Sequence, residues 1–493
     1  MGIIIRQSLI STVLTYLGVI IGYVNMLILF PKYMSPEEVG LQRVFQDAAM
    51  LMVPFVQLGI GQLIVKFFPE FKSKDYYSEF VSLIFFLFII TTLIFSIVFS
   101  IFKSDISNYF STNSELVNNY LLHIAGLGIL LALHQLLVAF AQSLHNIVLP
   151  NFLKEVVLRA FTLVDITLFA TKTINFNQFV SILILAYLIN FIVLLFYLLK
   201  RKVLSISFKF EHIKWPLIQK MITYSLFTFL GASGILIIGK VDSIMVASMM
   251  DLQATAIYTT AFYIAVLIDL PKRAIAQIGM PIISNAFKKN DLIEIKTIYI
   301  KSSINNLIIG SLLFIGIWAN LTNIFALIPN NQIYALGKWV VIIVGAGKLV
   351  DMIAGLNGEI IVMSKHYRIN VYLIVFLTIF TISANYLLIP LYGLEGAAIG
   401  SSLALLLFNL SKLIFLYWKE NIQPFTVQTL KVMAVAGLAL IVGLKTPEMN
   451  GVALDILVRS ALVTSVFVSL ILWLKPSKDV DLLVKQIINK LKN

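Results

Sequence analysis

The sequence predicts an all-α integral membrane protein with about fourteen transmembrane helices. Of its 493 residues, 59% are hydrophobic and only 12% are charged, and the mean hydropathy is +0.95. A soluble protein of this length could not bury so much apolar surface. The composition therefore excludes a water-soluble enzyme and a disordered chain, and it makes the lipid bilayer the solvent that organises the fold.

Long apolar segments set the number of spans. A spanning helix needs about 20 mostly apolar residues, because the hydrocarbon core is about 30 Å thick and an α-helix rises about 1.5 Å per residue. Fourteen segments meet or approach this requirement. They are 7–30, 40–66, 79–102, 117–140, 150–170, 178–199, 217–239, 254–282, 298–319, 332–358, 367–388, 393–416, 426–443 and 452–474.

The basic residues of the loops predict the orientation, since cytoplasmic loops carry an excess of Lys and Arg. If the amino terminus is cytoplasmic, one set of loops holds thirteen of these residues and the other set holds four. This alternation indicates an even number of spans, with both termini cytoplasmic. The net charge of +13 then indicates loops facing anionic lipid rather than nucleic acid. The larger set is Lys72, Lys74, Lys200, Arg201, Lys202, Lys209, Lys214, Lys288, Lys289, Lys296, Lys365, Arg368 and Lys419, and the smaller is Lys32, Lys103, Lys172 and Lys445.

The chain offers little for enzyme chemistry. It has no cysteine, and its five histidines lie far apart without a metal-ligand spacing. The longest connection is the basic segment 200–216, so there is no extramembrane catalytic domain. We expect no catalytic residues, no metal and no cofactor, and any function lies within the bilayer.

An internal repeat predicts two similar bundles. A shift of 216 positions aligns Gly18 with Gly234, and a Phe-Lys-x-x-Asp pattern at 71–75 with the same pattern at 287–291. Six helices separate the copies, so both have the same orientation, and two bundles around a central site suit alternating-access transport. A membrane-embedded enzyme and an assembly role are the alternatives. The predicted domains are bundles at 1–199 and 217–416, a basic linker at 200–216, two additional helices within 417–474 and a basic amphipathic tail at 475–493.

Three motifs carry a family resemblance. The segment 31–41, PKYMSPEEVGL, resembles the loop after the first helix of bacterial polysaccharide flippases of the MOP superfamily, which also contains the MATE exporters and the lipid II flippases. The segments 240–261 and 389–400 are similar to the start of that family's second half and to its sequence between helices eleven and twelve. Fourteen spans and cytoplasmic termini agree with the family, so the resemblance covers nearly the whole chain.

The resemblance implies a carrier in the bacterial inner membrane that serves O-antigen or capsule synthesis. Such a carrier flips an undecaprenyl-pyrophosphate-linked oligosaccharide from the cytoplasmic to the periplasmic leaflet by alternating access. Coupling to H⁺ or Na⁺ belongs to this expectation. The expected partners are the polyprenyl-diphosphate-linked glycan, membrane lipids and the polysaccharide polymerase machinery. The alternative is MATE-type ion-coupled export of drugs or metabolites.

Several charged residues lie within the predicted spans. A charge at mid-helix costs about 2.5 to 3.5 kcal/mol, so such residues normally face a bundle interior or a water-filled cavity. Basic side chains would lower the barrier for a diphosphate, and acidic ones would pair with them or bind the coupling ion. The candidate substrate-binding residues are Arg43, Arg159, Lys272, Arg273 and Lys348, and the candidates for ion coupling or charge pairing are Asp47, Asp269 and Asp351.

The spacing of these charges also allows a structural interpretation, since residues three or four apart share one helix face. The pairs are Arg43 with Asp47, Asp269 with Arg273, and Lys348 with Asp351. Each could be a salt bridge that fixes helix packing. Lys240 and Asp242 are expected to cap the periplasmic end of the span 217–239, and Asp165 lies deep in the span 150–170 without an assigned role.

Overall fold

The computed structural model describes residues 2–480, apart from 73, 75, 145, 208 and 478. Within this part of the chain every regular element is a helix, and many helices are long and apolar enough to cross a membrane. The predicted all-α membrane fold is therefore confirmed. Most of the predicted amphipathic tail, residues 481–493, lies outside the described residues, as does His145.

The chain forms two compact units, Met1–Ala256 (unit 1) and Ile257–Asn493 (unit 2). The chain passes from one to the other within α11, Leu252–Val266. Helix α10, Trp215–Met249, packs against α3, Pro36–Gln57, and is therefore grouped with unit 1 by its contacts. The domains predicted from the repeat begin the second bundle at residue 217, and this division stays a prediction.

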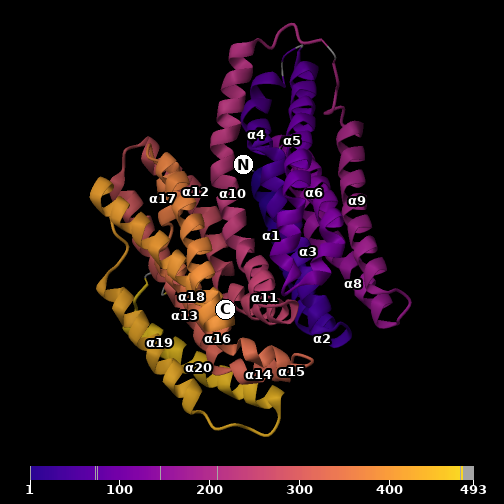
Figure 1. Ribbon diagram of the computed structural model, residues 1–493. Coiled ribbons are helices and arrows are strands. Elements are labelled where there is room, and N and C mark those ends of the chain that lie inside the picture. The colour runs from indigo at the N-terminus through magenta and orange to yellow at the C-terminus, as the bar shows by residue number, and fades with distance from the viewer. Residues whose placement is uncertain are drawn as a thin grey trace. The chain divides into compact units, whose positions relative to one another are not determined.

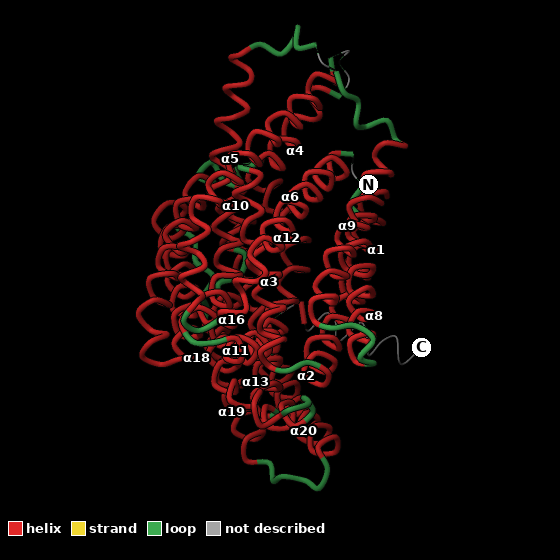
Figure 2. Tube along the Cα trace, turned by 45° about the vertical axis from the view of Figure 1, so that its right-hand side comes forward, coloured by secondary structure: helices red, strands yellow, loops and turns green. Residues whose placement is uncertain are grey.

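Unit 1 is built around α3, which packs against α6 and α10, while α6 also packs against α4 and α9 (Figures 1 and 2). The inward faces of these helices carry apolar side chains with almost no solvent exposure, such as Val44, Phe45, Leu63 and Phe140. Its other elements are α1 (Gly2–Tyr23), η1 (Val24–Leu29), α2 (Phe30–Tyr33), α4 (Ile60–Phe71), α5 (Tyr77–Ser111), η2 (Glu115–Tyr120), α6 (Leu121–Ser143), α7 (Val148–Phe152), η3 (Leu153–Val157), α8 (Leu158–Ala170) and α9 (Phe176–Lys200).

Helix α3 begins at a capping box. Ser35 Oγ accepts from the Glu38 amide at 3.2 Å, and Glu38 Oε2 accepts from the Ser35 amide at 2.8 Å, so two free amides at the helix start are satisfied. The helix ends where Leu58 and Gly59 have positive φ angles of 44° and 83°. The predicted span 40–66 is therefore two helices, α3 and α4, bent by 48°.

Two π-helical turns lie in unit 1, at Val24–Leu29 and at Leu153–Val157. The second joins α7 to α8, so the predicted span 150–170 is one helical run from Val148 to Ala170 interrupted by a wider turn. Such turns are uncommon inside α-helices and often occur at functional sites. They leave no signal in a hydropathy profile.

The basic connection 200–216 is held against the start of α5. Tyr77 Oη donates to the Val203 carbonyl at 2.8 Å, and the Ser207 amide donates to Ser82 Oγ at 2.8 Å. The His212 amide donates to Glu79 Oε2 at 3.0 Å. Val203 and Ile213 are buried, whereas Ile206, Phe210 and Trp215 are exposed. The predicted placement of this segment on lipid headgroups stays a prediction.

Unit 2 packs around α13, which contacts α12, α16, α19 and α20. Figure 1 shows the last two helices, in yellow, side by side. Val435 of α19 and Phe467 of α20 join Ile304 and Leu307 of α13 in one buried apolar cluster. The elements after α11 are η4 (Leu267–Asp269), α12 (Leu270–Lys288), α13 (Leu292–Ala319), α14 (Leu321–Ala326), α15 (Asn331–Tyr334), η5 (Ala335–Gly337), α16 (Lys338–Ile353), α17 (Asn357–Met363), α18 (Arg368–Glu420), α19 (Val427–Lys445) and α20 (Val452–Leu474).

Helix α18 consists of two arms. A straight helix of its 53 residues would be about 80 Å long, more than twice the thickness of a hydrocarbon core. The backbone leaves the helical region at Gly393, with φ 58° and ψ −129°. Beyond Gly393 the chain turns back on the first arm. This is shown by Gly396, where an added Cβ would lie only 2.1 Å from the carbonyl oxygen of Leu388. The two arms correspond to the predicted spans 367–388 and 393–416.

The structure does not confirm the predicted number of spans. Eleven helices among the described residues are long and apolar enough to cross a membrane, or twelve if the bent pair α3 and α4 forms one span. The difference from fourteen concerns α18, whose two arms count as one element by this measure, and the run 148–170, which carries four charged residues, Lys154, Glu155, Arg159 and Asp165. Fourteen spans therefore stay a prediction.

Candidate functional site

In unit 1, Asp47 of α3 is the centre of an ionic cluster. Asp47 as a whole residue is 1% exposed. Arg43 Nε lies 2.9 Å from Asp47 Oδ2, Lys240 Nζ donates to Asp47 Oδ1 at 2.6 Å, and Ser243 Oγ donates to Asp47 Oδ2 at 2.7 Å. The predicted pairing of Arg43 with Asp47 is confirmed.

The prediction that Lys240 and Asp242 cap the end of a span is wrong, because both lie inside α10. Helix α10 continues to Met249, so Lys240 lies in its interior and its side chain points to α3. The apolar run ends at residue 239, and for this reason the sequence predicts the end of the span there. The helix continues beyond it, and the ion pair with Asp47 compensates the charge of Lys240 inside unit 1.

Arg159 lies in the same unit, at the start of α8. Its guanidinium donates to Glu155 Oε2 at 2.8 Å and also to the carbonyl oxygen of Gly18 in α1. The buried Tyr187 of α9 lies within electrostatic range of Arg43, Asp47 and Arg159. Unit 1 therefore gathers its two predicted substrate-binding residues around one region of its interior.

Asp165 of α8 is a functional candidate to which the sequence analysis gave no role. It is 1% exposed, and neither carboxylate oxygen has a hydrogen-bond partner among the described residues. An ionised carboxylate in such a place is costly unless a cation pairs with it, and a bound proton removes the charge. Its depth in an apolar span is the signal that pointed to it.

In unit 2, the predicted charges pair across helices rather than within them. Lys348 Nζ of α16 lies 3.2 Å from Asp269 Oδ2, and Lys272 Nζ of α12 lies 2.7 Å from Asp351 Oδ2. The predicted pairing of Lys348 with Asp351 and of Asp269 with Arg273 is therefore wrong.

Helix geometry explains this exchange of partners. Asp269 ends the 3₁₀ turn η4 and precedes α12, and Pro271 lies in the first turn of that helix, so Asp269 and Arg273 do not belong to one regular helix. Arg273 is exposed and has no ion-pair partner among the described residues. The four paired side chains are 14% to 21% exposed, so protein atoms do not fully enclose the two ion pairs.

The pair of Lys272 with Asp351 extends into a polar network with α17 and α18. Asn409 Nδ2 donates to Asp351 Oδ1 at 3.0 Å, and Asn357 Nδ2 donates to Asn409 Oδ1 at 2.9 Å. Lys412, one turn beyond Asn409, is only 7% exposed. Sequence reasoning missed Lys412, because a lone lysine near the end of a predicted span is usually a residue that reaches toward the headgroups.

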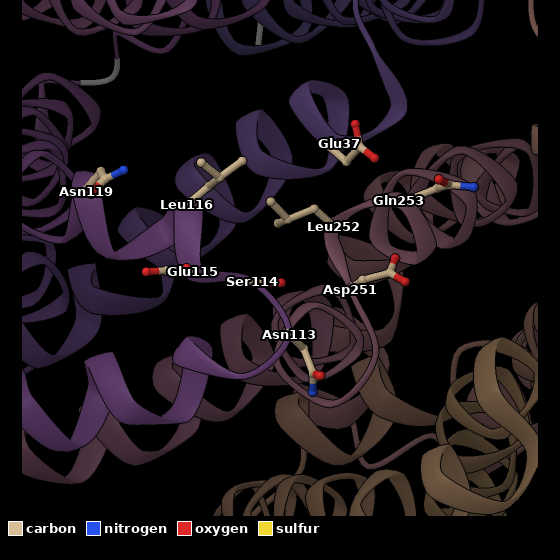
Figure 3. Close-up of a pocket in the computed structure, with 9 residues that line it drawn as sticks. All are labelled: Glu37, Asn113, Ser114, Glu115, Leu116, Asn119, Asp251, Leu252 and Gln253. Atoms are coloured by element: carbon tan, nitrogen blue, oxygen red, sulfur yellow. The ribbon is translucent and has the colours of Figure 1, made fainter.

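A pocket of about 400 Å³ lies in unit 1 (Figure 3). It is formed by the start of α3, the segment around η2 and the start of α11, and none of the predicted site residues lines it. No cluster of three or more potential metal ligands exists among the described residues. The lining residues are Glu37, Asn113, Ser114, Glu115, Leu116, Asn119, Asp251, Leu252 and Gln253.

Comparison with solved structures shows the fold. The lipid II flippase MurJ in an inward closed conformation is similar with a TM-score of 0.73 and 17% identity, covering 94% of this chain and 98% of that one. An inward-facing multidrug resistance MATE family transporter of the MOP superfamily gives a TM-score of 0.65 and 13% identity, covering 84% and 97%. The Vibrio cholerae MATE transporter VcmN in its bent form gives 0.55 and 13%, covering 85% and 98%.

Sequence comparison identifies the family. No curated protein matches the chain. The family model for polysaccharide biosynthesis proteins matches residues 4–287, more than half of the 493 residues. The resemblance predicted from the three motifs is confirmed. The chain belongs to the polysaccharide biosynthesis protein family, and it has the fold of the MOP superfamily of membrane transporters.

Proposed function

We propose that the protein is a flippase for lipid-linked glycans. It carries an undecaprenyl-pyrophosphate-linked oligosaccharide from the cytoplasmic to the periplasmic leaflet by alternating access, for O-antigen or capsule synthesis. The family and the fold support a transporter of a lipid-linked substrate. The observation that carries the proposal is the presence of partly exposed basic side chains inside both units.

The chemistry of the substrate explains these residues. A diphosphate is strongly disfavoured in hydrocarbon, and charge-assisted hydrogen bonds from Arg and Lys replace the water that it loses. In unit 1, Arg43 and Arg159 supply planar guanidinium groups, which suit bidentate contacts with phosphate oxygens. In unit 2, Lys272, Arg273 and Lys348 supply further positive charge. Diphosphate oxygens take the places of the carboxylates that now pair with Arg43, Arg159, Lys272 and Lys348.

Within each unit, the acidic partners offset part of the positive charge between transport cycles. Asp47, Asp269 and Asp351 each accept from at least one basic side chain, which lowers the cost of holding these cations in the membrane. Asp165 lacks such a partner among the described residues. We therefore assign the binding of a coupling H⁺ or Na⁺ to Asp165 as part of this proposal.

The protein acts in the bacterial inner membrane with both termini in the cytoplasm. The excess of Lys and Arg in alternate loops supports this orientation. The flipped glycan then passes to the polysaccharide polymerase machinery, and the protein itself catalyses no covalent step. Export of drugs or metabolites is the second candidate, because MATE transporters share the fold.

Deletion of the gene tests the proposal. Lipid-linked oligosaccharide should accumulate in the cytoplasmic leaflet, and the wild-type gene should restore export. Arg273→Ala and Lys348→Ala should fail to restore it while inserting normally, whereas Lys301→Ala, which changes an exposed lysine of unit 2, should restore it. Unchanged lipid intermediates together with raised sensitivity to cationic drugs would contradict the flippase and favour the exporter.

A further inference from the structure

The Asp351 carboxylate occupies a site with several donors. It accepts from Lys272 Nζ at 2.7 Å and from Asn409 Nδ2 at 3.0 Å. Asn357 fixes the Asn409 amide, because its Nδ2 donates to Asn409 Oδ1 and thereby turns the Asn409 amino group toward Asp351. An ammonium and an oriented amide that meet at one carboxylate are also suitable donors for a phosphate group.

Lys412 adds a positive charge that this carboxylate does not neutralise. No carboxylate oxygen among the described residues lies within 4.0 Å of its ammonium, which is buried 3.6 Å above the centre of the Phe408 ring. Its charged neighbours at longer range are Asp351, Lys272 and Glu359. Close packing against α17 holds it there, since a Cβ on Gly358 would lie 3.1 Å from Lys412 Nζ. A buried ammonium without a close counter-ion is costly.

We propose that Lys272, Asn409 and Lys412 form a diphosphate-binding site in unit 2, and that the Asp351 carboxylate occupies the place of one phosphate group while the site is empty. The proposal rests on the proposed function for the source of the diphosphate, a lipid headgroup. One phosphate takes the donors that now hold Asp351. The added negative charge of the diphosphate balances Lys412, and this balance compensates for the displacement of the carboxylate.

Asp351 is then a competitor of the substrate, which gives the proposal an unusual consequence. A substrate must break the contacts of Lys272 and Asn409 with Asp351 before it binds. Removal of the charge from Asp351 should therefore tighten binding, although loss of a partner usually weakens an ionic site. We expect Asp351→Asn to raise the affinity for diphosphate by about tenfold or more, equivalent to about 1.4 kcal/mol.

Direct binding measurements on the purified full-length protein test this consequence. Inorganic pyrophosphate and farnesyl diphosphate are titrated against the wild type, Asp351→Asn and Asp351→Ser, so that either variant can supply the result if the other does not fold. Asp479→Asn is the matched control, because it removes a carboxylate paired with an exposed lysine, Lys301, and changes the net charge equally. Its affinity should equal that of the wild type.

The outcomes separate the proposal from its alternatives. Tighter binding by an Asp351 variant, lost again when Lys412→Met is added, supports the site. An unchanged affinity, or an equal gain in Asp479→Asn, overturns it. Preference for farnesyl diphosphate supports a lipid headgroup as the ligand, and equal affinity for inorganic pyrophosphate overturns that source. The deletion experiment is independent of these measurements. If no lipid-linked glycan accumulates but the Asp351 effect is present, the glycan function fails and the anion site stands.

Discussion

Replacement of Asp47 by Asn should strongly destabilise unit 1. The Asp47 side chain is 2% exposed, and its carboxylate accepts from Lys240 and Ser243 beside the Arg43 guanidinium. Removal of one partner of a buried ion pair costs about 3 to 5 kcal/mol, because the remaining charge is left without compensation. The side chains of Arg43 and Lys240 are 17% and 19% exposed and can be partly hydrated, so we expect a loss near the lower end, about 3 kcal/mol.

A double-mutant cycle with Lys240→Met measures the interaction itself. Lys240→Met alone leaves Asp47 with Arg43 and Ser243 and should cost less, about 1 to 2 kcal/mol. The double variant has no uncompensated lysine, so its loss should be smaller than the sum of the two single losses by about 1 to 2 kcal/mol. The free energy of unfolding in bicelles, measured by steric trapping, provides the four values.

The exposed pair of Lys301 with Asp479 in unit 2 provides the control cycle. Its side chains are 52% and 37% exposed, and pairs of this kind contribute about 0.2 to 1 kcal/mol. Additive losses for Asp47 and Lys240, or a coupling energy no larger than that of the control pair, would refute the assignment of Asp47 as the centre of the cluster.

Three further changes test other parts of the structure. Gly40→Ala should greatly reduce the yield of folded protein, because the added Cβ would lie 1.9 Å from the carbonyl oxygen of Leu252. Gly437→Ala is the control, because a Cβ at Gly437 would meet no atom within 4 Å. Equal yields of the two variants by fluorescence-detected size-exclusion chromatography would contradict this packing. Gly393→Ala should lower the melting temperature, because a strained φ of 58° costs about 1 to 3 kcal/mol, and an unchanged value would argue against the turn between the arms of α18. Asp165→Asn should abolish the dependence of export on the ion gradient in proteoliposomes, and a retained dependence would remove Asp165 from coupling.

Much of the fold follows from local properties of the sequence. The apolar runs that predict spans coincide with helices because a helix satisfies its backbone hydrogen bonds within one segment, which hydrocarbon requires. The π-helical turn at 153–157 and the bend after α3 divide helices at places where the predicted spans 150–170 and 40–66 continue without a break. For this reason hydropathy located the long helical runs but not the breaks within them.

The candidate site was less accessible to sequence reasoning. Arg43 and Asp47 pair as predicted because four residues separate them on one regular helix. Lys348 and Asp351 do not pair with each other, because Lys348 pairs with Asp269 and Asp351 pairs with Lys272. These partners are brought together by tertiary packing, which the spacing along the sequence does not reveal. In unit 2, four of the charged residues singled out from the sequence form ion pairs, but their spacing did not predict which residues pair.

Water accessibility of the charged residues in unit 2 tests the central claim most directly. The chain contains no cysteine, so single cysteines at Asp269, Arg273, Lys348 and Asp351 can be introduced without background labelling. A membrane-impermeant maleimide, applied to inverted vesicles with and without a diphosphate probe, reports which positions water reaches. We predict labelling at all four positions, with protection by the probe at Arg273 and Lys348. Failure of the reagent to reach any of the four, in every condition, would contradict a path for a charged headgroup.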